Sequence, residues 1–311
     1  MEPKNIIDSE GKKLIFAGLD NAGKSSIILT LLREMSKITV IKATKGAQRR
    51  VYEFLGTKIS EWDLGGHEKY RDKYLKQPDL FFRADLAIYV IDVQDTQRLP
   101  KAIKYLNDII EQFLLLKIEP PIYILFHKYD PDFTENVQNE LGNKVDNLID
   151  KIKELANYGN FYFYKTSIFD LKSIINTMSE ILLITFPKSK EISDLVLDFA
   201  KKLDVEGIEL IDDNSLLISS FYSDNTTKNI ISLTSPYFLA INDKFSEAKS
   251  EPCQLEDQIL VRRFGKFFIF KKFVLKKGGT PYYLICCKNE SDFNADIYNK
   301  FVLNLKDIIY K

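Results

Sequence analysis

The sequence lacks the features of several protein classes. Lys plus Arg and Asp plus Glu both number 44, so the net charge is zero and no overall attraction to nucleic acid or anionic membrane is expected. No apolar run approaches the ~18 residues that a membrane-spanning helix needs. The composition, 45% hydrophobic and 28% charged residues, is that of a soluble globular protein, and 311 residues suffice for two domains.

Cysteine is scarce, with only Cys253, Cys286 and Cys287 in the chain. Neighbouring residues on a strand point to opposite faces, so Cys286 and Cys287 make a poor disulfide or metal-binding pair. No CxxC spacing occurs. We therefore expect buried strand thiols in a reducing compartment, and neither a redox nor a zinc site.

Targeting and lipid-attachment signals are also missing. The first residues, Met1–Asn5, have no basic stretch followed by an apolar core, and Glu2 stands where N-myristoylation needs glycine. The last four residues, Ile308–Lys311, do not form a prenylation motif. We expect a cytoplasmic protein with no direct membrane anchor, which reaches a membrane only when partners recruit it.

The first half of the chain alternates strand and helix signals, which predicts an α/β domain with a doubly wound, mainly parallel sheet. Apolar runs such as Leu86–Ile91 are typical of strands that are buried on both faces. The expected strands are 14–17, 49–55, 58–62, 86–91, 122–126 and 161–164, and the expected helices are 26–32, 101–116, 134–156 and 171–186.

Beyond Pro187–Lys190 the order of elements changes. It becomes helix, two strands, helix, three strands and helix, which predicts a smaller α/β domain with an antiparallel five-stranded sheet. The expected segments are 192–203, 207–211, 216–222, 227–248, 258–264, 267–275, 282–287 and 292–310. We expect the domain limits to be 1–188 and 191–311.

The segment Gly18–Ser25 has the pattern GxxxxGK[ST] between an expected strand and an expected helix, the context of a phosphate-binding P-loop. Its glycines permit a tight path whose N–H groups surround a β-phosphate. Lys24 supplies a cation to the β- and γ-phosphates, and Ser25 offers a hydroxyl to Mg²⁺. The alternative, a chance glycine turn, fits this context poorly. The nucleotide-binding residues expected here are Gly18, Asp20, Asn21, Ala22, Gly23, Lys24, Ser25 and Ser26.

Three more segments follow expected parallel strands, at the edge where open α/β sheets bind ligands. In Trp62–Gly66, Asp63 is expected in the Mg²⁺ shell and Gly66 at the γ-phosphate. Asp130, in His127–Asp130, can accept from both the N1–H and the 2-amino group of guanine, donors that adenine lacks. Lys128 is expected to pack along the base. In Thr166–Ile168, a backbone N–H of Ser167 or Ile168 can meet guanine O6.

Together these segments resemble the Ras superfamily. Gly18–Ser25 and Trp62–Gly66 are most similar to the Arf branch. His127 in place of Asn, the segment Thr166–Asp170 and the run Phe82–Asp92 resemble the Rag (Gtr) GTPases. The resemblance implies a P-loop GTPase domain followed by a roadblock/longin-like domain. It also implies GTP or GDP as ligand with Mg²⁺, held by Ser25, Thr44 and Asp63.

The resemblance places switch I at about 38–50 and switch II at about 65–74. Thr44 matches the Thr that binds Mg²⁺ and γ-phosphate, although a solvated loop Thr is the alternative. His67 stands where related proteins carry a water-orienting Gln. It could orient the attacking water or be a surface histidine, and both readings stay open. The expected catalytic residues are His67, Thr44 and Lys24. No arginine finger is evident, so we expect slow turnover and an activating partner.

His127 lies in the base motif, where we expect guanine preference to survive through Asp130. Basic and aromatic residues alternate over 258–275, which allows an RNA or lipid surface, but we favour amphipathic strands and no nucleic-acid partner. The resemblance implies a homodimer or heterodimer through residues after about Lys190, roadblock-type scaffold proteins, and a GTPase-activating or exchange partner. The leading hypothesis is a GTP-binding molecular switch. The alternatives are a nucleotide-binding scaffold without turnover and a P-loop kinase or ATPase, against which Asp130 argues.

Overall fold

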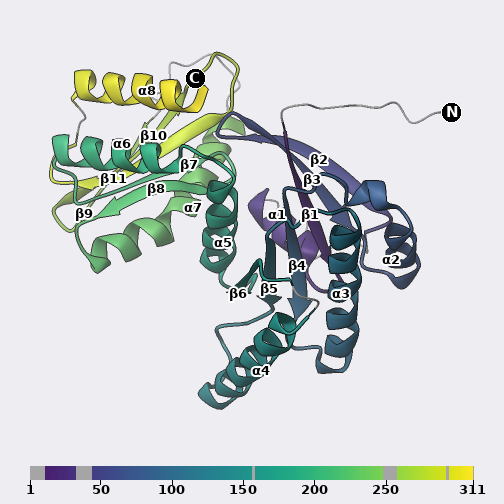
Figure 1. The fold of residues 1–311 in the computed structure, drawn as a ribbon. Coiled ribbons are helices and arrows are strands. Elements are labelled where there is room, and N and C mark those ends of the chain that lie inside the picture. The colour runs from purple at the N-terminus through teal and green to yellow at the C-terminus, as the bar shows by residue number, and fades with distance from the viewer. Residues whose placement is uncertain (1–10, 33–43, 156–157, 248–257, 292–293, 311) are drawn as a thin grey trace. The chain divides into compact units, whose positions relative to one another are not determined.

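A computed structural model describes residues 11–32, 44–155, 158–247, 258–291 and 294–310 (Figure 1). The chain divides into two compact units, Met1–Thr177 and Met178–Lys311, and the division falls within α5 (Leu171–Ile184). The domain limits expected from the sequence, 1–188 and 191–311, stay predictions.

The first unit contains a six-stranded sheet in the order β2-β3-β1-β4-β5-β6. All neighbouring pairs are parallel except β2 with β3, which form an antiparallel pair. The prediction of a mainly parallel, doubly wound sheet is therefore confirmed. The strands are β1 (Lys12–Gly18), β2 (Ala47–Phe54), β3 (Thr57–Leu64), β4 (Leu86–Asp92), β5 (Ile122–His127) and β6 (Phe161–Thr166).

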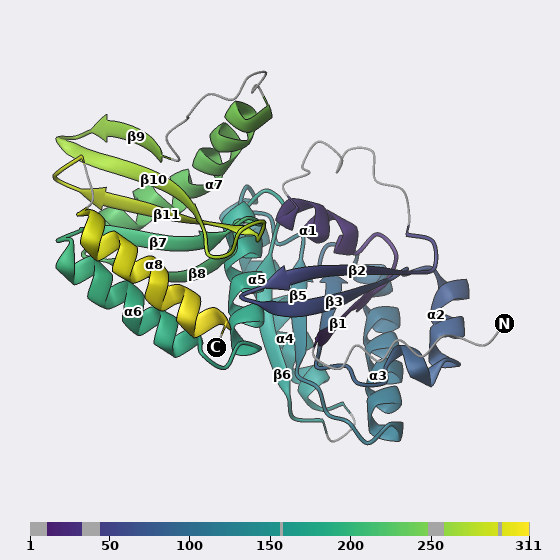
Figure 2. The same cartoon turned by 90° about the horizontal axis from the view of Figure 1, so that it is seen from above.

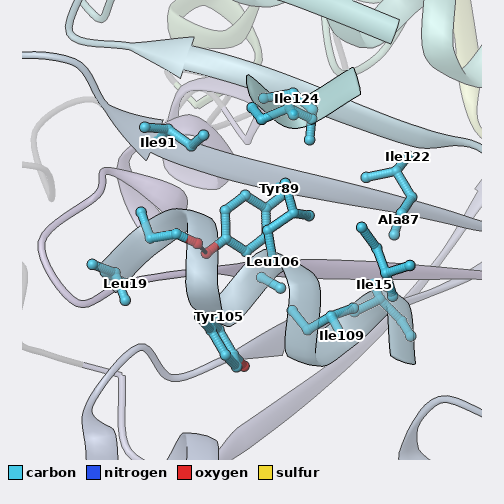
Figure 3. Close-up of a cluster of buried hydrophobic side chains, with 14 of the residues drawn as sticks. Ile15, Leu19, Ala87, Tyr89, Ile91, Tyr105, Leu106, Ile109, Ile122 and Ile124 are labelled. Atoms are coloured by element: carbon cyan, nitrogen blue, oxygen red, sulfur yellow. Dashed lines mark hydrogen bonds between the residues drawn. The ribbon is translucent and has the colours of Figure 1, made fainter. Parts of the chain in front are cut away.

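Helices cover both faces of this sheet, and Figure 2 shows α1 and α3 on opposite sides of the strands. One face packs against α2, α3 and α4 in a single buried cluster, part of which is drawn in Figure 3. Within it the Tyr89 hydroxyl donates to the Ala102 carbonyl at 2.6 Å, so a polar group buried in the core keeps a partner. The helices are α1 (Lys24–Leu31), α2 (Glu68–Leu75), α3 (Leu99–Leu115) and α4 (Glu135–Lys153).

The second unit contains a five-stranded antiparallel sheet in the order β8-β7-β11-β10-β9, as predicted. Figures 1 and 2 show α7 on one face and α6 with α8 on the other. Phe238 of α7 stacks on Phe270, whereas Phe301 of α8 stacks on Phe199 of α6. The elements are α6 (Ser189–Lys202), β7 (Gly207–Asp212), β8 (Leu217–Tyr222), α7 (Asn225–Glu247), β9 (Gln258–Arg263), β10 (Lys266–Val274), β11 (Pro281–Lys288) and α8 (Ala295–Tyr310).

Three short elements were not expected from the sequence: α2 and the 3-10 helices η2 (Pro78–Leu80) and η3 (Thr96–Arg98). α2 is mostly charged and buries only Arg71 and Tyr74, so it has no continuous apolar face that periodicity could detect. Among the described residues, no helix is long and apolar enough to cross a membrane.

Two of the three cysteines can be placed. Cys286 and Cys287 are buried free thiols of β11, as expected. Burial raises the pKa of both, that of Cys287 to about 11, which keeps the thiols protonated and unreactive. Cys253 lies outside the described residues.

Candidate functional site

The loop from β1 to α1 has a backbone path that only glycine permits at two positions. Gly18 has φ 139° and Gly23 has φ 98°, both in the left-handed region. A Cβ on Gly18 would lie 2.4 Å from the Val90 carbonyl oxygen, and one on Gly23 would lie 2.3 Å from Cδ2 of His127. The loop therefore packs directly on β4 and on the end of β5.

Lys24 begins α1 and is buried, with 5% of its surface exposed. Its Nζ donates to the carbonyls of Gly18 at 3.0 Å and Leu19 at 2.8 Å. Burial lowers the pKa of Lys24 to about 8, while the carboxylates of Asp63 and Asp20 oppose that shift. A cavity of about 210 Å³ opens beside this lysine, and its lining residues are Asp20, Asn21, Ala22, Gly23, Lys24, Ser25, Ser26, Thr44, Gly66 and His67.

Three oxygen-bearing side chains meet next to the cavity. Ser25 Oγ lies 2.9 Å from Thr44 Oγ1, and these hydroxyls donate to Asp63 Oδ2 at 3.4 and 3.3 Å. They come from α1, from the residues before β2 and from the end of β3. Burial raises the pKa of Asp63, and Lys24 is the main influence that lowers it. Thr44 is thus described, but the rest of the expected switch I before it, residues 38–43, lies outside the described residues.

The glycine pair after β3 brings the start of the expected switch II against the P-loop. A Cβ on Gly66 would lie 2.1 Å from the backbone nitrogen of Asp20, and one on Gly65 would lie 2.5 Å from the Thr44 carbonyl oxygen. The Gly66 carbonyl accepts from Arg71 Nε at 3.0 Å. Arg71 is buried, and its guanidinium lies 4.9 Å from the centre of the Tyr105 ring. Its anchoring to α3 fixes the loop in which Gly66 lies.

His67 and His127 occupy different environments. His67 is exposed at the start of α2 and lines the cavity. His127, at the end of β5, is 1% exposed, and its Nδ1 shares a hydrogen bond of 3.0 Å with Thr166 Oγ1. Burial, followed by the charge of Lys128, lowers the pKa of His127 to about 4, so the ring is neutral at pH 7. His127 joins the P-loop to the base motif by packing on Gly23.

The expected base-binding residues lie together at the ends of β5 and β6. Lys128 Nζ pairs with Asp92 Oδ2 at 2.7 Å. Asp130 Oδ1 accepts from Ser167 Oγ at 2.5 Å, and Asp130 Oδ2 accepts from Gln94 Nε2 at 2.7 Å. Ile168 follows Ser167 in the turn after β6. All strands that carry these groups are parallel, so their carboxyl ends meet at one edge of the sheet.

The structure thus brings the P-loop residues, Thr44, Asp63, Gly66 and His67 together at one end of the site, and the base-motif residues at the other. Sequence reasoning gave no role to Gln94 or Arg71. Gln94 lies two residues after Asp92, the last residue of β4, so the rule that ligands bind at carboxyl ends of strands could have found it. No sequence pattern distinguishes Arg71 from its charged neighbours.

A family model agrees with this arrangement. The model of the Gtr1/RagA G protein conserved region matches residues 13–246, more than half of the chain. This chain belongs to the Gtr1/RagA family of G proteins. The Rag-like assignment made from the sequence is confirmed, and the family implies a guanine nucleotide as ligand. The match continues past the first unit through β7 and β8 into α7, and the antiparallel sheet of the second unit is consistent with a roadblock-like domain.

Curated relatives of this Rag-type GTP-binding protein are Arf-like. ADP-ribosylation factor-like protein 3 of Chlamydomonas reinhardtii is 30% identical over 128 residues, 41% of this chain and 68% of the relative. Protein alp41 of Schizosaccharomyces pombe and ADP-ribosylation factor-like protein 5 of Caenorhabditis elegans are each 30% identical over 118 residues, 38% of this chain. The chain spans 60% and 62% of the length of these two relatives.

Among solved structures, the small GTPase Arl6 (BBS3) from Trypanosoma brucei with bound GppNp is similar to this chain. The identity is 20% and the TM-score is 0.39, with 53% of this chain and 91% of that chain covered.

Proposed function

We propose that this Rag-type protein is a GTP-driven molecular switch that hydrolyses GTP slowly and signals by nucleotide-dependent binding of partners. The observation that carries the proposal is the meeting of Ser25, Thr44 and Asp63 beside the buried Lys24. These residues join the P-loop to the segments on both sides of the β2–β3 hairpin. A change at the terminal phosphate would therefore reach both switch segments.

The donor atoms fit Mg²⁺. Carboxylate and hydroxyl oxygens are the hard ligands that this ion prefers. Within the described part of the chain, Asp63 Oδ1 is buried without a hydrogen-bond partner, as expected of an atom meant for a ligand outside the protein. We infer that Ser25, Thr44 and Asp63 hold the ion, which when bound supplies positive charge against the β- and γ-phosphates.

Thr44 and Gly66 are the residues through which we expect the switch to sense the γ-phosphate. Gly66 lies against Asp20 of the P-loop, and Gly65 lies against the Thr44 backbone. A phosphate that accepts from the Gly66 N–H would hold these two segments together, and its loss would release them. Lys24 would stabilise the charge on the phosphates throughout.

The residues proposed for hydrolysis line the cavity beside Lys24. His67 lines the cavity and is exposed to solvent, so its ring can reach and orient an attacking water. We infer slow intrinsic turnover that an activating partner accelerates. The alternative is a nucleotide-binding scaffold with little or no GTP hydrolysis.

Guanine recognition is assigned to Asp130, with the Lys128 stem along the base. In the described turn after β6, the Ser167 N–H donates to Ser173 Oγ and the Phe169 N–H donates to Ser167 Oγ. The Ile168 N–H is therefore the amide that we assign to guanine O6. Asp130 then distinguishes guanine from adenine, since adenine offers no pair of donors to its carboxylate.

We further propose that the second unit forms a homodimer or heterodimer and docks roadblock-type scaffold proteins. α7 carries four exposed apolar side chains at four-residue spacing, one stripe of a helix: Leu233, Tyr237, Ile241 and Phe245, which are 60%, 71%, 43% and 58% exposed. β9, at the edge of the sheet, exposes Leu260 and Val261. Such a surface typically marks a protein interface. Partners would also provide nucleotide exchange and recruitment from the cytoplasm to a membrane.

The first experiment identifies the nucleotide that co-purifies with the full chain and measures GTP hydrolysis with and without His67→Ala. Trp62, the single tryptophan, precedes Asp63 in β3, and Lys13 and Arg49 lie 5.2 and 5.7 Å from the centre of its ring. Its emission should therefore report the switch. We expect emission to differ between GDP and a non-hydrolysable GTP analogue, and Thr44→Ala to abolish the difference. No hydrolysis and identical emission would favour the scaffold, and tighter binding of ATP would favour a kinase or ATPase.

The second experiment measures the mass of the full chain in solution by light scattering. We expect a dimer that Tyr237→Glu dissociates, because burying the new charge in an apolar interface is costly. The matched control is Leu303→Glu, an exposed leucine of α8 in the same unit. A dimer that survives Tyr237→Glu but not Leu303→Glu would contradict the assignment to α7.

A further inference from the structure

Gln94 lies in the loop between β4 and η3, and its amide contacts the base motif at two points. Its Nε2 donates to the Lys128 carbonyl oxygen at 2.8 Å and to Asp130 Oδ2 at 2.7 Å. Both partners can only accept, so the amide nitrogen, and not its oxygen, must face them. One exposed side chain therefore uses both of its N–H groups to join the turn after β5 to the carboxylate of Asp130.

The loop that carries Gln94 is itself held in place. The Gln94 backbone N–H donates to Asp92 Oδ1 at 3.0 Å, and Asp92 Oδ2 accepts from Lys128 Nζ at 2.7 Å. Lys128 has φ 64°, a left-handed conformation that is disfavoured in residues with a Cβ. Contacts to both its ammonium and its carbonyl stabilise this conformation, which determines where Asp130 lies.

The contacts of Asp130 leave lone-pair sites on its carboxylate for a ligand. A carboxylate has about four lone-pair sites, two on each oxygen. Ser167 Oγ occupies one on Oδ1, and Gln94 Nε2 occupies one on Oδ2. One site then remains on each oxygen, which matches the two donors that guanine presents, its N1–H and its 2-amino group.

We propose that Gln94 is a positioning residue for guanine selectivity. It orients the Asp130 carboxylate so that both oxygens face the base, and it acts on the nucleotide only through Asp130 and the Lys128 turn. The inference rests on the proposed recognition of guanine by Asp130.

The test measures the affinity of the nucleotide-free full chain for GDP, inosine diphosphate and ADP by calorimetry. Inosine keeps the N1–H but lacks the 2-amino group. We expect Gln94→Ala to weaken GDP binding about tenfold, as when a charge-assisted hydrogen bond is lost, and to narrow the preference for GDP over inosine diphosphate. ADP binding should not change. Gln97→Ala, at an exposed position of the adjoining η3, is the matched control.

A second variant, Gln94→Glu, distinguishes a loss of the Asp130 orientation from a general disruption of the loop that carries residue 94. The charged groups around this position are Asp92, Asp95, Lys128 and Asp130. At pH 8 the new carboxylate repels Asp130 and the Lys128 carbonyl, so GDP should bind more weakly than to Gln94→Ala. At about pH 5.5 a protonated Glu can donate to Asp130, so the variant should recover part of the GDP affinity that it loses at pH 8, when each pH is compared with wild type.

The outcomes distinguish the two proposals. If wild type does not prefer GDP over ADP, or Asp130→Asn keeps that preference, guanine recognition by Asp130 itself is wrong. If wild type and Asp130→Asn behave as proposed but Gln94→Ala keeps the wild-type affinity and GDP-to-inosine preference within twofold, only the role of Gln94 is overturned. An equal loss for GDP and ADP in Gln94→Ala, or no recovery of Gln94→Glu at low pH, also overturns it.

Discussion

The two ends of the nucleotide site are built in different ways. The phosphate end is a backbone loop that close packing on Val90 and His127 holds in one path, with the buried cation Lys24 at the start of the following helix. The base end is a set of side-chain hydrogen bonds in which Asp130 is held by Gln94 and Ser167. The difference teaches where each kind of selectivity comes from. Under the proposed function, phosphate binding depends on main-chain geometry that suits any nucleotide, whereas the choice of base depends on the orientation of the Asp130 carboxylate.

The largest expected effect tests the phosphate end. Lys24→Ala should weaken GTP, GDP and ADP alike by about 3–4 kcal/mol, or roughly 100- to 1000-fold in Kd, because a buried cation near the phosphates is removed. Calorimetry with all three nucleotides measures this. Lys45→Ala, at an exposed position beside Thr44, is the control and should bind as wild type does. A loss of affinity confined to GTP and GDP would contradict the assignment of Lys24 to the phosphates that all three nucleotides share.

The next effect tests the base end. Asp130→Asn turns an acceptor that faces the guanine N1–H into a donor, and should weaken GDP about 100-fold while ADP binding stays unchanged. Xanthosine diphosphate, with an oxygen in place of the 2-amino group, should gain affinity. The control is Asp132→Asn, an exposed carboxylate two residues away. Equal losses for GDP and ADP would show that Asp130 supports the fold and does not read the base.

His127 connects the two ends of the site, and its protonation should destabilise the folded protein. The folded protein lowers the pKa of His127 from 6.5 to about 4, so between these values the unfolded chain binds a proton that the folded chain excludes. The free energy of unfolding should therefore fall as the pH drops from about 6.5 to about 4, by roughly 2–3 kcal/mol from this residue. Urea unfolding of wild type and His127→Asn across this range isolates the contribution.

The second histidine supplies the control for that measurement. His67 is exposed at the start of α2, so His67→Ala is the matched histidine substitution for the urea series. If the free energy of unfolding falls equally for His127→Asn and wild type on acidification, the inference that His127 is buried in its neutral form is wrong.

The smallest expected effect tests one hydrogen bond of the Asp130 carboxylate. Ser167→Ala removes the hydroxyl that donates to Asp130 Oδ1 and should weaken GDP about five- to tenfold, since one hydrogen bond to a charged group is lost. ADP serves as the control ligand and should bind as before. GDP affinity equal to that of wild type would mean that Gln94 alone orients the carboxylate.

Much of the fold followed from local patterns. Long apolar runs such as Leu86–Ile91 and Ile122–Phe126 predicted β4 and β5, since strands buried on both faces have no polar alternation. The helix α2 could not be found, because its buried residues are an arginine and a tyrosine among charged neighbours. Its position depends on Arg71, whose contacts with Gly66 and Tyr105 connect residues far apart in the sequence.

The candidate site shows the same division between local and long-range features. Motifs that form within one loop, such as Gly18–Ser25, carry their geometry in their own spacing, because glycine conformation and the helix start are local. The partners of Asp130 were not predictable, since Gln94 and Ser167 come from the ends of two other strands. Likewise, the sequence placed His127 in a base motif but did not indicate that its ring would be neutral and packed on Gly23.

The sequence by itself determined the kind of protein: the segments Gly18–Ser25, Trp62–Gly66 and His127–Asp130, in that order, resemble a Rag-like GTP-binding chain. The order of elements after Lys190 predicted the second, antiparallel sheet. Only the tertiary structure decided how the same residues are held. It buried one histidine and exposed the other, and it joined Ser25, Thr44 and Asp63 across three segments. The reason is physical: burial and orientation depend on neighbours that parallel strands bring together, and sequence spacing does not encode those neighbours.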